Sequence, residues 1–182
     1  MSAIAQYLKW NSIDITGSDR SLNSIDTDSV KKKLTSIGCH IFPQNGSGIT
    51  VNTGAIVLSS AIEESNPDFQ QAKKLNIPVF HRSEVLASIV ETKKTIAVAG
   101  TNGKSTVTGL IYHMLSLCNK KPSLIGGGNL HTLADKGLIG NAYYCDSEFL
   151  VIEADESDGT LIQYKPYISI FLNLSKDHKP VS

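Results

Sequence analysis

The stretch Thr95-Ile96-Ala97-Val98-Ala99-Gly100-Thr101-Asn102-Gly103-Lys104-Ser105-Thr106 decides the fold of this chain. Its first five residues form an apolar run, which is typical of a strand buried in a parallel sheet. A glycine-containing turn follows, and the residues from Lys104 onward predict a helix. A strand, a glycine turn and a helix that begins with Lys-Ser-Thr, in this order, are the context in which a loop binds phosphate.

The residue types of this loop fit phosphate chemistry. Backbone N–H groups and the helix N-terminus hold phosphate oxygens, Lys104 supplies a cation, and Ser105 offers a hydroxyl to Mg²⁺. The spacing differs from the common GxxxxGK[ST] pattern, because the first glycine of that pattern would fall at Val98. An ordinary strand-to-helix turn with an exposed lysine is the alternative, and the order of the elements favours the phosphate loop.

Strand-like and helix-like segments alternate on both sides of this loop, which predicts an α/β fold with mostly parallel sheets. Helices are expected over residues 2–10, 27–37, 67–75, 83–90 and 104–118, the helix from 67 capped by Asn66 and the helix from 83 capped by Ser83. Strands are expected over 13–16, 39–42, 54–58, 79–80, 95–99, 123–126, 149–153 and 167–172. Residues 126–148 are rich in Gly and Asn and receive no assignment.

A polar joint, Glu91-Thr92-Lys93-Lys94, precedes the central strand and is the expected domain boundary. We therefore expect a Rossmann-like N-terminal domain over residues 1–91. A partial P-loop parallel-sheet domain follows over residues 92–182.

Composition excludes several classes of protein. The 182 residues are 41% hydrophobic, so the chain can bury a real core and does not read as disordered. Seventeen basic and seventeen acidic residues give zero formal charge, which argues against nucleic acid or an anionic membrane as a partner. The sequence has no apolar run of membrane-spanning length, and its three cysteines lie far apart, so a reducing, cytoplasmic setting is the default.

Carboxylates follow another apolar strand, in Ile152-Glu153-Ala154-Asp155-Glu156-Ser157-Asp158-Gly159. The carboxyl ends of parallel strands meet at one edge of a sheet, and Mg²⁺ prefers hard oxygen ligands. Glu153, still on the strand, is the favoured metal ligand, whereas Asp155 and Asp158 fit a solvated acidic turn equally well. His178 ends the segment Asn173-Leu174-Ser175-Lys176-Asp177-His178 after the next strand; an imidazole there suits either a metal shell or a structural role.

Three motifs, Gly-Thr-Asn-Gly-Lys-Ser-Thr, Glu-Ala-Asp-Glu-Ser-Asp and Asn-x-x-x-Asp-His, resemble the Mur ligase family of ATP-dependent amide-bond-forming enzymes. The first ninety residues resemble the branch of that family that uses UDP-N-acetylmuramic acid. The segments that carry this second resemblance are Met1-Ser2-Ala3-Ile4-Ala5, Gly17-Ser18-Asp19, Ser59-Ser60-Ala61-Ile62, Asn66-Pro67 and Ile77-Pro78-Val79 with Arg82.

The resemblance implies ATP and Mg²⁺ as cofactors and a set of site residues. Lys104 would contact the β- and γ-phosphates, Ser105 or Thr106 would hold Mg²⁺, and Glu153 and His178 would bind the same or a second Mg²⁺. Lys104, Glu153 and His178 form the expected catalytic set, and the whole loop, Gly100, Thr101, Asn102, Gly103, Lys104, Ser105 and Thr106, the expected ATP site. The expected contacts to the UDP-sugar are Asp19, Ser59, Ser60, Ala61 and Arg82.

Relative to the glycine-rich turn that the resemblance implies before Met1, Asp19 would have the position of a Rossmann acid that meets a ribose; a simple turn aspartate is the alternative. Compared with the family, we expect a strand and a glycine-rich turn to be missing before Met1. We likewise expect part of the central domain and a C-terminal domain to be missing after Ser182.

The implied reaction joins L-alanine, or a murein peptide, to UDP-N-acetylmuramate through an acyl phosphate. The expected full-length protein is thus a carbon–nitrogen ligase of peptidoglycan precursor synthesis. This chain, as a part of it, would be inactive by itself. A non-catalytic nucleotide-binding fragment and a ligase that recycles murein peptide are the alternatives.

Overall fold

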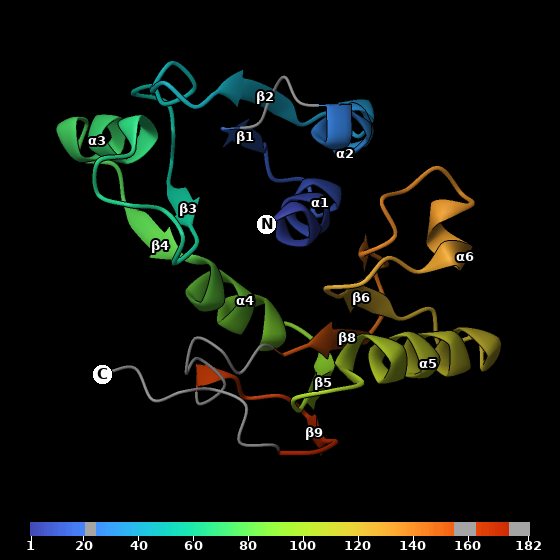
Figure 1. Ribbon diagram of the computed structural model, residues 1–182. Helices are drawn as coiled ribbons and strands as arrows, with labels where there is room; N and C mark the ends of the chain where they lie inside the picture. Colours follow the sequence, from blue (N-terminus) through green and yellow to red (C-terminus); the bar gives the residue numbers. More distant parts are fainter. Residues whose placement is uncertain (21–24, 155–162, 175–182) are drawn as a thin grey trace.

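A computed structural model describes residues 1–20, 25–154 and 163–174 (Figure 1). Asp155, Asp158 and His178 therefore lie outside the described residues. In chain order the elements are α1 (Ser2–Trp10), β1 (Thr16–Asp19), α2 (Ile25–Ser36), β2 (His40–Pro43), β3 (Ile56–Leu58), α3 (Pro67–Lys74), β4 (Val79–His81), α4 (Arg82–Val90), β5 (Lys94–Ala99), α5 (Lys104–Leu117), β6 (Ser123–Ile125), α6 (His131–Ala134), β7 (Ala142–Tyr143), β8 (Phe149–Glu153) and β9 (Ile168–Phe171).

The predicted central strand lies inside a five-stranded sheet with the order β7-β6-β8-β5-β9. Every pairing in this sheet is parallel except that of β6 with β7. Val98 of β5 is opposite Glu153 of β8, and Ala99 is opposite Phe171 of β9. This register brings the carboxyl ends of β5, β8 and β9 to one edge, which is where ligands bind in sheets of this kind.

The N-terminal part contains two further sheets, each of two parallel strands: β1 with β2, and β3 with β4. The strand expected over 13–16 has other bounds in the structure, where β1 covers Thr16–Asp19. Gly17, Ser18 and Asp19 are themselves strand residues, because they pair with Ile41, Phe42 and Pro43. Turn-forming residue types are weak signals where a neighbouring strand offers them a hydrogen-bonded ladder.

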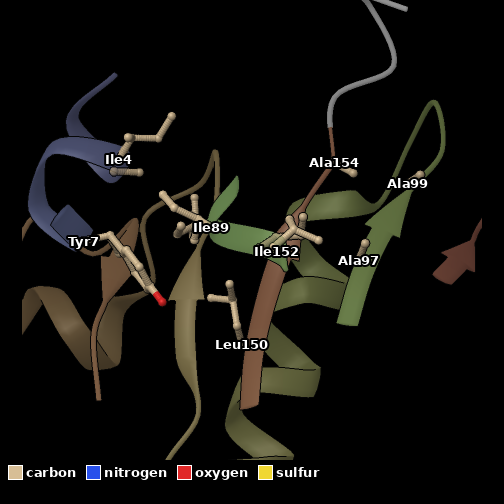
Figure 2. Close-up of a cluster of buried hydrophobic side chains, with 12 residues drawn as sticks. Ile4, Tyr7, Ile89, Ala97, Ala99, Leu150, Ile152 and Ala154 are labelled. Atoms are coloured by element: carbon tan, nitrogen blue, oxygen red, sulfur yellow. The ribbon is translucent and has the colours of Figure 1, made fainter. Parts of the chain in front are cut away.

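The hydrophobic core is continuous across the expected domain boundary. Ile4 and Tyr7 of α1 and Ile89 of α4 pack with Leu150 and Ile152 of β8 in one buried cluster (Figure 2). On the opposite face of the sheet, Val151 packs with Tyr112 of α5, Leu124 and Leu133. Neighbouring residues of β8 thus face different helices, as the alternation of side chains along a strand requires. The division at residues 91 and 92 stays a prediction.

Two further local expectations need correction. His81, not Ser83, caps α4: the His81 ring nitrogen Nδ1 accepts from the Ser83 N–H at 3.4 Å, and the Glu84 carboxylate accepts from the His81 N–H at 2.6 Å. This reciprocal arrangement is a capping box.

The unassigned segment 126–148 contains the short helix α6 and the strand β7. Across the part of the chain that the structure describes, no helix has both the length and the apolar character to cross a membrane.

Candidate functional site

The phosphate-loop candidate joins β5 to α5 at the carboxyl edge of the central sheet. Gly103 is the N-cap residue of α5, has φ of 87°, and provides no side-chain hydrogen bond to the helix. The N–H groups in the first turn of a helix have no acceptor within the helix. Because Gly103 has no side chain to cap this turn, its N–H groups and the positive end of the helix dipole suit an anion.

Lys104 lies at the start of this helix with its side chain folded back over the loop. Its ammonium Nζ donates to the Gly100 carbonyl at 2.6 Å and approaches the Thr101 carbonyl at 3.3 Å. The loop therefore holds a cation next to an uncapped helix N-terminus. Two positive features at one place suit a multiply charged anion such as a polyphosphate.

The loop is attached to the end of β9 by Asn173. The Asn173 side chain accepts from the Asn102 N–H at 2.9 Å and donates to the Asn102 carbonyl at 2.9 Å, while the Thr101 N–H donates to the Asn173 carbonyl at 3.1 Å. In this arrangement the N–H groups of Thr101 and Asn102 hold the loop against β9. Direct phosphate contacts by these two residues stay a prediction.

Gly100 permits this close approach. Its φ is +133°, and a Cβ built there would lie 3.1 Å from the backbone N and O of Asn173. That region of backbone conformation is open essentially to glycine alone. The sequence motif that contains Asn173 did not predict this contact with the loop. Its signal was that a polar residue closely follows an apolar strand at the ligand-binding edge.

Glu153, the last residue of β8, contacts the start of α5. Its oxygen Oε1 accepts from the Ser105 hydroxyl at 3.0 Å, and its Oε2 accepts from the Gly127 N–H at 2.9 Å. Gly127 packs directly on the carboxylate, because a Cβ there would lie 3.2 Å from both oxygens. The structure thus brings Lys104, Ser105 and Glu153, three of the predicted site residues, to one edge.

The chemistry of Ser105 and Glu153 fits Mg²⁺. Magnesium is commonly bound by one or two carboxylates with substrate phosphates and water, rather than by a complete set of protein ligands. Within residues 1–20, 25–154 and 163–174, no group of three or more His, Cys, Asp and Glu side chains could hold a metal ion. Glu153 and Ser105 could hold Mg²⁺ as such a partial set of protein ligands, and the predicted ligand His178 lies outside the described residues.

The residues expected to bind the UDP-sugar lie on the two small sheets, at the carboxyl ends of their strands. Asp19 is the exposed last residue of β1, Ser59 to Ala61 directly follow β3, and Arg82 directly follows β4. The amino group of Met1, at the start of α1, lies near Arg82. Burial, and then the positive charge of Arg82, lower the pKa of this amino group. The amino end of α1 and Arg82 therefore belong to one region.

This geometry defines an α/β protein in which a glycine-containing loop joins a strand to a helix at the carboxyl edge of a parallel sheet, an arrangement typical of phosphate-binding loops. Models of two protein families match it: "Mur ligase family, catalytic domain" over residues 1–94 and "Mur ligase middle domain" over residues 98–179. The chain belongs to the Mur ligase family.

Named relatives agree with this assignment. A UDP-N-acetylmuramate–L-alanine ligase from Buchnera aphidicola is 37% identical over 179 residues, which are 98% of this chain and 35% of that protein. One from Cyanothece is 36% identical and covered over 36% of its length. The crystal structure of a UDP-N-acetylmuramate–alanine ligase from Thermotoga maritima matches with a TM-score of 0.85 and 26% identity, covering 98% of this chain and 40% of that one. The chain thus spans between 35% and 37% of the length of the curated relatives it matches.

Proposed function

We propose that this chain provides the ATP-binding edge and the UDP-sugar-binding part of an ATP-dependent ligase that joins L-alanine to UDP-N-acetylmuramate. The observation that carries the ATP half is the meeting of Lys104, Ser105 and Glu153 at the uncapped start of α5. Curated relatives that are 34–37% identical and bear the name of the L-alanine ligase support the substrates. A murein peptide in place of L-alanine is the alternative amine.

The residues of this edge suit phosphoryl transfer, which depends mainly on positioning and on neutralisation of charge. ATP would convert the muramate carboxylate to an acyl phosphate, and the amine would displace phosphate from it. Lys104 and the first turn of α5 would hold the phosphates in place. Glu153 and Ser105 would hold Mg²⁺, which supplies additional positive charge on the transferred phosphoryl group.

The UDP-sugar half of the proposal rests on the N-terminal part. We assign residues 1–91 to UDP-sugar binding, through Asp19, Ser59, Ser60, Ala61 and Arg82, and residues 92–182 to ATP binding. The placement of these five residues at or just after the carboxyl ends of parallel strands supports the assignment, because nucleotides bind at such strand ends. A reducing compartment such as the cytoplasm suits the free cysteines Cys39, Cys118 and Cys145.

Calorimetric titration with Mg-ATP tests the ATP half. Lys104→Ala should weaken binding by about ten- to hundredfold, because it removes charge-assisted hydrogen bonds to phosphate worth about 1.5–3 kcal/mol. The matched control is Lys120→Ala, which removes an exposed lysine just beyond the other end of α5 and should leave the affinity unchanged.

A second variant separates the metal from the phosphate. Glu153→Gln should weaken ATP binding in the presence of Mg²⁺ and have little effect when EDTA replaces the metal. Equal Mg-ATP affinity in the wild type and Lys104→Ala would reject the phosphate loop. A loss in Glu153→Gln that is the same with and without the metal would reject the Mg²⁺ assignment alone.

A further inference from the structure

Asp68 is a buried carboxylate in the N-terminal part, away from the phosphate loop. Its exposed fraction is 6%, and it is the second residue of α3, directly after Asn66 and Pro67. A carboxylate removed from water is costly unless hydrogen-bond donors surround it. The hydrogen-bond donors that contact Asp68 therefore indicate the role of this residue.

Those donors come from two other segments of the chain. The Ser18 hydroxyl, in β1, donates to one carboxylate oxygen, and the Gly46 N–H, after β2, donates to the other at 2.6 Å. The N–H of Asp68 itself donates to the Asn66 side chain at 2.9 Å. One carboxylate thus connects the region after β2 and the end of β1 to the helix that follows β3.

Gly46 lies directly against α3. Its φ is +85°, and a Cβ built there would lie 3.5 Å from both the Pro67 carbonyl and the Gln71 Cβ. The contact to Asp68 is therefore part of a close approach between the turn after β2 and the first turn of α3. This approach leaves the carboxylate little freedom to move.

This connection matters because β1 and β3 belong to different sheets. In the described residues β1 pairs with β2 and β3 pairs with β4, and the two pairs appear as separate arrows in Figure 1. Backbone ladders therefore do not fix the end of β1 relative to the residues that follow β3. Side-chain contacts such as those of Asp68 must set this distance.

We propose that Asp68 is a positioning residue for the uridine nucleotide, an inference that rests on the proposed function. Asp68 holds Ser18, the neighbour of Asp19, against the first turn of α3, the helix that follows the segment Ser59–Ala61 in the chain. Asp68 makes no contact with the nucleotide. It fixes the separation between Asp19, the candidate for the ribose, and the segment Ser59–Ala61, which is assigned to the same UDP-sugar.

The test measures the affinity for UDP by ligand-observed NMR, well below the unfolding temperature of every variant. Asp68→Ala should weaken UDP binding by about tenfold, and Ser18→Ala, which alters an exposed residue, by a few-fold. The double variant should bind UDP no more weakly than Asp68→Ala, because both changes break the same contact. The Mg-ATP affinity should stay constant throughout.

Two further variants isolate the geometry of the contact. Asp68→Asn should recover most of the affinity, since its amide can accept from the Gly46 N–H and donate to the Ser18 hydroxyl. Asp14→Asn, which changes an exposed carboxylate in the same part of the chain, should have no effect. Additive losses in the double variant, or a parallel loss of ATP binding, would show general loosening and overturn the role of Asp68.

Failure of the proposed function gives a different result. A wild-type chain that binds Mg-ATP but not UDP would reject the uridine assignment, and with it any positioning for uridine. A wild-type chain that binds UDP with the same affinity as Asp68→Ala would overturn the role of Asp68 alone.

Discussion

The helices α3 and α5 begin in opposite ways, although each follows a parallel strand. At the start of α3, the Asn66 side chain accepts from the N–H groups of Asp68 at 2.9 Å and Phe69 at 3.2 Å, and Pro67 occupies the first helical position. At the start of α5, Gly103 has a left-handed backbone and provides no side-chain cap. The N-cap side chain thus accepts hydrogen bonds at the start of α3, whereas the N-cap glycine of α5 supplies no side-chain acceptor.

The difference shows how a helix start can serve either stability or binding. The side chain of Asn66 satisfies N–H groups that would otherwise need another acceptor, which stabilises the helix. The start of α4 is closed in the same manner by His81 and Glu84. At α5 the N-cap residue Gly103 supplies no such side-chain acceptor, and the adjacent residue is a lysine. An anion can take the place of the missing cap.

The largest effect should come from the glycine that allows the open loop to approach β9. Gly100→Ala forces a side chain into a φ of +133° and toward the Asn173 backbone at 3.1 Å. We expect the free energy of unfolding to fall by about 2–3 kcal/mol, measured as a lower midpoint of urea denaturation.

Two matched glycines separate the strain at Gly100 from its crowding. Gly137 has φ of +81° with nothing within 4 Å of a built Cβ, so Gly137→Ala should cost about 1 kcal/mol from the backbone alone. Gly54 has neither a positive φ nor a near neighbour, so Gly54→Ala should lose nothing. The same midpoint for all three variants would show that the close packing of the loop on β9 is wrong.

The next effect removes the cap of the closed helix. Asn66→Ala should lower the free energy of unfolding by about 1 kcal/mol, because the cap of α3 is buried and two N–H groups lose their acceptor. Asn66→Asp keeps an acceptor and should lose much less. Thermal unfolding measures the difference, and titration with Mg-ATP should give the wild-type affinity for both variants. A lower ATP affinity would mean that the two helix starts are coupled.

The sequence predicted the parts of the fold whose signals are local. The strand Phe149–Glu153 and the helix Ser2–Trp10 have the predicted bounds, because a bare apolar run and a one-sided apolar pattern are each complete within the element. Asn66 caps α3 as predicted, since Asn followed by Pro forms a cap from neighbouring residues alone. The contact of Glu153 with the start of α5 was predictable because both lie at the carboxyl edge of one parallel sheet.

The features that sequence reasoning missed depend on residues far apart in the chain. The expected strand over 13–16 stopped short of Ser18, because only the pairing with Phe42 of β2 makes Ser18 a strand residue. The role of Asp68 requires Ser18, which is 50 positions away, and that of Asn173 requires Asn102, which is 71 positions away. Ser83 was the expected cap of α4 because histidine is a rare cap residue. Only the contact between the His81 ring and the Ser83 N–H identifies His81 as the cap.

The smallest effect should come from Asn173, which keeps the open helix start in place without contributing charge. Asn173→Ala removes two hydrogen bonds to Asn102 that are exposed, so we expect a loss of about 0.5–1 kcal/mol in the free energy of unfolding. The Mg-ATP affinity should fall by a few-fold, because the loop loses its attachment to β9 and the bound arrangement becomes less populated.

The stability and Mg-ATP affinity of Asn173→Asp should lie between those of the wild type and Asn173→Ala. The aspartate still accepts from the Asn102 N–H, but it places an acceptor opposite the Asn102 carbonyl. Asn52→Ala, an exposed asparagine in the N-terminal part, is the control and should change neither quantity. An Asn173→Ala variant with the wild-type affinity for Mg-ATP would show that Gly103 and Lys104 suffice for phosphate binding at the start of α5, without the attachment to β9.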